Sequence, residues 1–418
     1  MKALLMIFVI AGNYNYFYLV PNTTLIKYAP DISLLVLFGL LGYQTFIERT
    51  DLARINTFVT WFVFCYLLLV IIQASVASFY YEQSVFDGIV VARKQFSFLA
   101  AISLMMMFKT GADIEKFMTW MSIVAAVIVY LGLVNYFGPT IFYHRWAEGQ
   151  GIRSGIVRAY LPGLEILVLA FIWNLVKILS SERLSRVSLM FLLIAVFGLI
   201  FRQTKMHIIV SFLVGVLVML YYRKFLHVFI ITGTIFLGSF AFSTFTNQNI
   251  IVNIFQTAYE SVFTSEESID GGVNTWAGRM EQVDASFKTI EDTFFTGSGG
   301  VVIRGIGVDG GVSKELHLIS RGMDLGYFVW VKFFGFPGIL LLAGLYIYVV
   351  WQRIIATSRS SDPYFYIDNY AFFHFLIIAL SMVTIGYFNH EHAISILCVC
   401  LAIIGVRAKS SRLVGQGQ

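Results

Sequence analysis

The chain has 418 residues with a formal net charge of +5; 58% of the residues are hydrophobic, only 13% are charged, and the mean hydropathy is +0.79. A soluble domain carries about 25% charged residues. No soluble core could bury so much apolar surface, so the composition predicts a polytopic membrane protein and excludes a soluble enzyme. Cys65, Cys398 and Cys400 fall inside apolar stretches and indicate neither a disulfide framework nor a metal-binding pair.

Apolar stretches of membrane-spanning length follow one another along the chain, and they predict an all-α integral membrane protein with about twelve transmembrane helices. The predicted spans are 3–20, 30–47, 56–77, 90–108, 116–137, 158–179, 187–201, 206–222, 225–243, 325–350, 366–387 and 391–407. The chain therefore divides into spans one to nine (1–243), a large loop (244–324), and spans ten to twelve with a tail (325–418).

The loop from 244 to 324 is the only long part of the chain that is not hydrophobic. Apolar residues recur in it at alternating steps of four and three, which predicts an amphipathic helix; they are Trp276, Met280, Val283, Phe287, Ile290 and Phe294. Asn274 or Thr275 can cap the start of this helix, and Gly297 stands where it would stop. The apolar stripe is expected to lie in lipid or on the spans.

The glycine-rich run that begins at Gly297 does not indicate a nucleotide site. Gly297-Ser298-Gly299-Gly300 lacks the Gly-Lys-Ser/Thr ending of a phosphate loop, so we expect a flexible rim or tight turns. His390-Glu391-His392 also lacks the spacing of the helical His-Glu-x-x-His pair and predicts no metal.

The distribution of lysine and arginine predicts the orientation in the membrane. Fifteen of them fall in one set of short loops and termini and eight in the alternate set. Because cytoplasmic loops carry the excess of positive charge, both termini are expected in the cytoplasm and the large loop outside, in the periplasm of a two-membrane bacterium.

Seven of the eight cations in the short loops on the predicted outer side are candidates for an anion site. Two arginines of the large loop are candidates as well. The seven are Arg93, Lys94, Arg145, Arg153, Arg158, Arg202 and Lys205, and the loop adds Arg304 and Arg321. Lysine and arginine are normally few on the outer side of a membrane protein, so their presence there suggests that they bind a phosphate or pyrophosphate ligand. The alternative is that they reach outer-leaflet headgroups or pair with acidic side chains.

Two further residues are candidates for acid–base chemistry, and one arginine is a candidate for charge stabilisation. His317 lies beside Glu315 and Arg321, and Asp324 follows at the entry to the tenth span. Arg279 lies in the first turn of the predicted loop helix, where the helix dipole disfavours a cation.

Four short stretches, with the predicted topology, resemble the O-antigen polymerase and O-antigen ligase superfamily. They are Arg153–Val157; Phe201–Lys205; Thr275–Arg279 with Gly297-Ser298-Gly299; and Asp324–Tyr327 with Gly335-Phe336-Pro337-Gly338. Ligases tend to carry His-Asn before the tenth span, whereas Leu318 follows His317 here, which favours the polymerase branch. In this superfamily an arginine is more usual at the position of Lys205, so the resemblance implies that either Arg202 or Lys205 binds phosphate.

The resemblance implies a membrane glycosyltransferase with a fold related to the GT-C type. It implies a polyprenyl-pyrophosphate-linked oligosaccharide as donor and a second lipid-linked repeat unit as acceptor, with no nucleotide sugar, no required metal and no other cofactor. A chain-length regulator would be a further partner, and nothing indicates a nucleic acid. A ligase that transfers the glycan to a lipid core, and a transporter of the same lipids, stay open as alternatives.

Overall fold

The computed structural model describes residues 1–19, 28–49, 55–81, 84–143, 152–153, 156–157, 161–181, 185–202, 205–224, 233, 283–284, 287, 289–299, 326–357, 360–383 and 391–415. These residues are helical, apart from turns and one antiparallel pair of short strands, β1 (Ile152–Arg153) and β2 (Ile156–Val157). The architecture is that of a helical membrane protein.

Each predicted span contains helix, except the span at 225–243, which lies outside the described residues apart from Gly233. The helices are α1 (Lys2–Asn13), η1 (Asn15–Tyr18), α3 (Ala29–Gly42), η2 (Tyr43–Ile47), α4 (Thr57–Tyr81), α5 (Val85–Ala92), η4 (Arg93–Phe98), α6 (Leu99–Met107), α7 (Gly111–Phe137), α9 (Leu164–Ser180), α10 (Arg186–Arg202), α11 (Lys205–Tyr221), α16 (Gly326–Ala356), α17 (Phe365–Ser381) and α18 (Glu391–Gly415).

Four stretches of helix in the described chain are long and apolar enough to cross a membrane: Ala29–Ile47, Thr57–Tyr80, Gly111–Phe137 and Gly326–Ala356. Shorter apolar helices lie at Lys2–Asn13, Met206–Tyr221, Phe365–Ser381 and Ala393–Ala408. Large apolar side chains on α4 and α16 are exposed, among them Trp61 at 64% and Ile347 at 70%. Apolar surface of this kind suits contact with lipid rather than with water.

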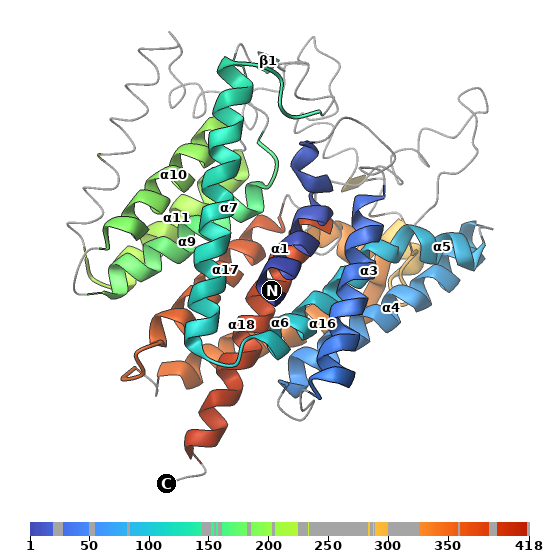
Figure 1. The fold of residues 1–418 in the computed structure, drawn as a ribbon. Coiled ribbons are helices and arrows are strands. Elements are labelled where there is room, and N and C mark those ends of the chain that lie inside the picture. Colours follow the sequence, from blue (N-terminus) through green and yellow to red (C-terminus); the bar gives the residue numbers. More distant parts are fainter. Residues whose placement is uncertain are drawn as a thin grey trace.

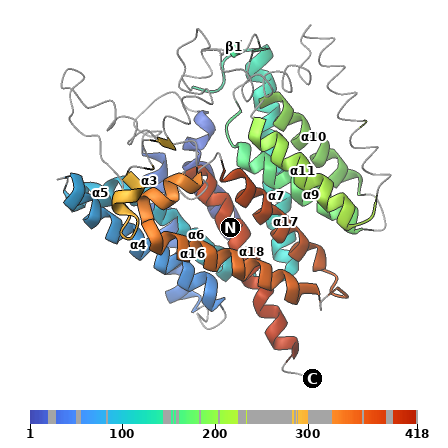
Figure 2. The same cartoon turned by 180° about the vertical axis from the view of Figure 1, so that it is seen from behind.

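The helices form two groups joined by a central set. Figures 1 and 2 show α7, α9, α10 and α11 on one side and α3, α4 and α5 on the other. Between them, α17 packs against α9, α11, α16 and α18, while α18 packs against α1, α4, α6 and α9. The C-terminus leaves the bundle at the end of α18 (Figure 1).

Two helices form the interior of the bundle. Residues 166–176 of α9 and 393–405 of α18 are all buried. Apart from Asn174 and Ser395, both stretches are apolar, and a helix without a polar face is stable only when neighbours surround it. The core therefore follows α9 and α18, and the helices with lipid-suited surfaces lie around them.

Three predicted boundaries change for local reasons. The first span ends early because α1 stops at Asn13, and Asn15–Tyr18 have positive φ. The fifth begins at Gly111, because Thr110 and Asp113 form a capping box. The fourth is not one continuous α-helix: the 3₁₀ segment η4 separates α5 from α6 and contains Arg93 and Lys94.

Polar contacts join helix ends that the alternation of spans places on the same side. On the predicted cytoplasmic side these are Lys2–Glu48, Lys177–Glu115, Lys224–Ser181, Arg353–Tyr221 and Arg407–Asp362. On the predicted outer side they are Arg93–Asp31, Tyr14–Glu165 and the backbone contact of Tyr143 with Tyr18. The described helices thus agree with the predicted alternation, while the number of spans and the orientation stay predictions.

Candidate functional site

The structure describes the side chains of three of the predicted site residues, Arg93, Lys94 and Arg202. Arg153 lies in β1, and Lys205 begins α11. The other predicted site residues lie outside the described residues; they are Arg145, Arg158, Arg279, Arg304, His317, Arg321 and Asp324.

Arg93 binds an acidic side chain of the chain itself. Its Nε donates to Asp31 Oδ1 at 2.5 Å and its Nη2 to Asp31 Oδ2 at 3.3 Å, while Nη1 donates to the carbonyl oxygen of Val90 at 2.7 Å. This is the two-pronged geometry that a guanidinium adopts with a carboxylate. Arg93 thus ties η4 to the start of α3, and its contacts fit the alternative of pairing with an acid.

Arg202 belongs to a group of polar residues from four segments, which we call the Arg202 cluster: Tyr14, Glu165, Arg202 and His207. Arg202 ends α10, His207 lies in the first turn of α11, Glu165 lies in the first turn of α9, and Tyr14 follows α1. The connection between α10 and α11 is short, so it holds the arginine and the histidine near each other.

Two observations join the members of the Arg202 cluster. The Tyr14 hydroxyl donates to Glu165 Oε2 at 3.0 Å. His207 is buried within electrostatic range of both Glu165 and Arg202. A guanidinium binds phosphate oxygens, while a carboxylate and an imidazole accept and donate protons, so this cluster has the groups that phosphate binding and proton transfer need.

A buried polar contact braces the helices close by. Asn13 Nδ2 donates to Ser395 Oγ at 2.6 Å, and Ser97 Oγ donates to Asn13 Oδ1 at 3.4 Å. The contact joins α1, η4 and α18 through side chains that are all buried. It explains the position of Asn13, which interrupts the first apolar stretch in the sequence.

The glycine segment after the loop helix contacts a break in α16. Gly335 has φ of 58° and ψ of −151°, so α16 consists of two helical pieces, and Pro337 follows two residues later. Ser298 N–H donates to the Lys332 carbonyl oxygen at 2.8 Å, and Gly299 N–H donates to the Phe333 carbonyl oxygen at 3.2 Å. In return, Phe336 N–H donates to the Phe294 carbonyl oxygen at 2.7 Å.

The loop helix that precedes this segment lies on α16. Residues 283–284, 287 and 289–293 are helical, and Val283 packs with Val329 and Phe328. The rings of Phe287 and Phe328 meet edge to face at 5.3 Å, and those of Phe294 and Phe336 lie 6.1 Å apart. The apolar stripe was expected to lie either in lipid or on the spans, and its described part packs on a span, α16.

Sequence reasoning missed Lys332, which lies inside an apolar run of α16 and is only 1% exposed. His207 and His374 are further buried ionisable side chains of the described helices. Asp368 and Arg407 are buried as well. A lysine or aspartate within an apolar stretch was the available signal, because a charge inside a span is costly unless it has a function or a partner.

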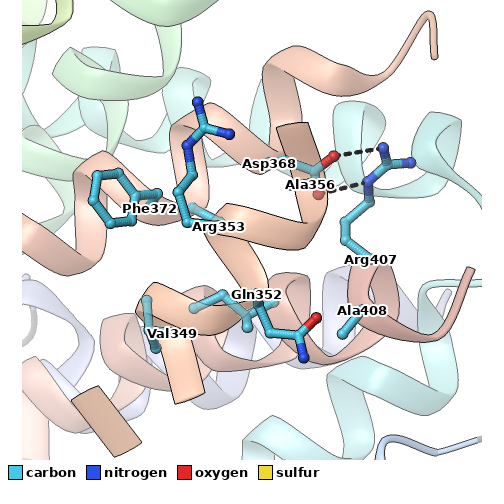
Figure 3. A pocket seen from close by; sticks show the side chains of 10 residues that line it. Val349, Gln352, Arg353, Ala356, Asp368, Phe372, Arg407 and Ala408 are labelled. Atoms are coloured by element: carbon cyan, nitrogen blue, oxygen red, sulfur yellow. Dashed lines mark hydrogen bonds and ion pairs between the residues drawn. The ribbon is translucent and has the colours of Figure 1, made fainter. Parts of the chain in front are cut away.

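A buried ion pair between α17 and α18, shown in Figure 3, lies near the C-terminal end of α16. Arg407 Nε and Nη2 donate to the two carboxylate oxygens of Asp368 at 3.0 and 2.7 Å, and Nη2 also contacts Asp362 at 2.7 Å. A cavity of about 20 Å³ lies beside the pair, bordered by Gln352 and Arg353. This volume holds about one water molecule, so the cavity is too small for a sugar or a lipid phosphate.

Arg353 at this end is held by aromatic rings. Its Nη2 donates to the Tyr221 hydroxyl at 2.7 Å, and its guanidinium lies 5.2 Å from the Tyr221 ring centre and 5.4 Å from that of Phe365. Such distances are typical of cation–π contacts. The polar groups at this end fasten α11, α16, α17 and α18 together, and the Arg202 cluster is the better candidate for a site.

No model of a known protein family matches the chain, and no curated protein matches it either.

Proposed function

We propose that this protein is a membrane glycosyltransferase that polymerises oligosaccharide repeat units linked to polyprenyl pyrophosphate, as in the synthesis of O-antigen or a related surface polysaccharide. It would act at the outer face of the bacterial inner membrane, with both termini in the cytoplasm and a fold of about twelve spans related to the GT-C type. The donor and the acceptor would both be lipid-linked repeat units.

The observation that carries the proposal is the Arg202 cluster. The cleavage of a sugar–phosphate bond leaves negative charge on the departing pyrophosphate, and a positioned guanidinium stabilises that charge. Arg202 lies at the predicted outer end of its helix, and the buried His207 lies within electrostatic range of both Arg202 and Glu165. A lipid-linked anion would enter such a site from the bilayer, and an acidic group and an imidazole near it would suit the exchange of a proton.

The loop would complete the site. Arg279 would stabilise the departing pyrophosphate together with Arg202 or Lys205. His317 or Asp324 would accept the proton of the acceptor hydroxyl as it attacks the sugar carbon. The proposal assigns no role to a nucleotide sugar or to a metal ion.

A lipopolysaccharide gel of a deletion strain tests the proposal and its alternatives. Loss of the polymerase leaves a single repeat on the lipid core. Loss of a ligase, which is the nearer alternative because only the acceptor differs, leaves the core bare while lipid-linked polymer accumulates. A bare core with lipid-linked single repeats that stay on the cytoplasmic face would instead identify a transporter. A normal ladder would refute all three.

A further inference from the structure

The break in α16 leaves backbone groups that must find partners elsewhere. In an α-helix the N–H of each residue bonds to the carbonyl four residues before it. Pro337 has no N–H to offer to Phe333, and the unusual backbone of Gly335 turns the Phe336 N–H away from Lys332. The Lys332 and Phe333 carbonyls and the Phe336 N–H therefore need partners outside the helix, because unsatisfied backbone groups inside a membrane protein are costly.

The segment Phe294–Gly299 supplies partners for all three groups. Ser298 and Gly299 donate to the two carbonyls, and the Phe294 carbonyl accepts from Phe336. A second helix fixes the same segment, because Gln73 Nε2 of α4 donates to the Thr296 carbonyl oxygen at 2.6 Å. The segment is thus bound on two sides through its main-chain atoms, and Ser298 within it is 0% exposed.

The fit requires three glycines. A Cβ on Gly335 would lie 2.4 Å from the Gly297 nitrogen, one on Gly297 would lie 2.3 Å from the Phe333 oxygen, and one on Gly299 would lie 2.4 Å from the Gln73 oxygen. The obstructing atoms belong to the backbone and cannot rotate away. All three glycines also have φ between +58° and +72°, a region that other residues rarely adopt.

We propose that the break in α16 is a positioning site that holds Phe294–Gly299 and thereby fixes the loop from its middle to the helical bundle. This proposal rests in part on the proposed function, because the catalytic candidate Arg279 precedes the segment Phe294–Gly299 while His317 and Asp324 follow it. Both parts of the loop then start from one rigid point on α4 and α16. Gly335, Gly297 and Ser298 act through the segment that they hold and are positioning residues.

Cysteine protection tests the positioning site without relying on activity. In a Cys65→Ser background, Ser298→Cys places a thiol at a fully buried position, while the native Cys398 and Cys400 are also buried. The thiol at 298 should be labelled by N-ethylmaleimide at least tenfold more slowly than in the denatured protein. Adding Gly335→Ala should abolish most of that protection.

Gly344→Ala is the matched control, because Gly344 lies in the same helix and a Cβ there would meet no atom within 4 Å. It should leave the protection unchanged. If Gly335→Ala lowers the yield of folded protein, Gln73→Leu replaces it, since this change removes the contact with Thr296 and leaves the glycines in place. Equal protection of position 298 in the Gly335→Ala, Gln73→Leu and Gly344→Ala backgrounds would overturn the positioning site.

The catalytic consequence has a separate readout. Small displacements of catalytic groups cost up to about a hundredfold in rate, so Gly335→Ala should lower polymerisation per folded molecule by about tenfold or more, while Gly344→Ala leaves it unchanged. A loss that merely follows the fraction of folded protein would overturn the positioning role. If the wild-type protein makes no polymer while the labelling results hold, the proposed function fails and the anchoring of the segment stands.

Discussion

The Ser298 N–H and the Lys332 carbonyl oxygen are joined by a hydrogen bond of 2.8 Å, and the Ser298 hydroxyl donates to the same oxygen at 3.1 Å. This contact and the hydrogen bond from the Phe336 N–H to the Phe294 carbonyl oxygen join the segment Phe294–Gly299 to the break in α16. They are one structural unit, in which the loop segment satisfies a helix that its own proline interrupts.

The ion pair between Arg407 of α18 and Asp368 of α17 should make a large contribution to stability. Arg407→Gln leaves the Asp368 carboxylate buried without its partner, and the loss of one member of a buried pair costs about 3–5 kcal/mol in the free energy of unfolding. The thermal unfolding midpoint of the detergent-solubilised protein should fall accordingly. Asp362→Asn is the control, because the Asp362 side chain is 28% exposed and its loss should cost less than about 1 kcal/mol. Equal shifts for the two variants would contradict the prediction.

Reporter fusions should reveal the predicted orientation. Fusions at Arg54, Arg183 and Arg353 should report a cytoplasmic position, and fusions at His144 and Gly310 an outer one, because the short loops of the first set carry the excess of lysine and arginine. A cytoplasmic signal at Gly310 would reverse the orientation and would remove the basis for an enzyme that acts outside.

Substitution of Arg279 should slow turnover without loss of protein. A charge-assisted hydrogen bond contributes about 1.5–3 kcal/mol, so Arg279→Ala should reduce polymer synthesis by about ten- to a hundredfold if the bond strengthens as pyrophosphate departs. Arg279→Lys should recover only part of the rate, because an ammonium cannot form the two-pronged contact. In parallel, Arg202→Ala and Lys205→Ala should identify which of them assists. Polymer of normal length in an Arg279→Ala strain with normal protein levels would dismiss this role.

The roles of His317 and Asp324 can be separated from a structural role by comparing activity with abundance. Asp324 precedes α16 and could act as its N-cap; loss of a cap costs about 1 kcal/mol of stability and leaves the activity of each folded molecule intact. Loss of a general base instead leaves abundance unchanged while single-repeat product accumulates. The measurement is polymerisation by purified His317→Ala and Asp324→Asn proteins. Normal rates in both would mean that neither residue accepts the proton.

The composition was sufficient to predict the helical membrane architecture, and the pattern of apolar stretches located most of the described helices. This works because a backbone in lipid must satisfy its own hydrogen bonds, so each long apolar run becomes a helix regardless of its neighbours. The periodicity of Val283, Phe287 and Phe294 likewise identified the apolar side of the loop segment that packs on α16.

Tertiary structure alone decided which partner each polar group meets. Arg93, a candidate ligand of an anion, binds Asp31 on another helix. Gly297-Ser298-Gly299 was expected to form a flexible rim or tight turns, and it also fills the break in α16, while Lys332 was overlooked. These contacts join residues far apart in the sequence, several through main-chain atoms that every residue possesses. Residue type and spacing can show that a proline frees a carbonyl, but only the packing of α4 against α16 brings Ser298 and Gly299 to the carbonyls of Lys332 and Phe333.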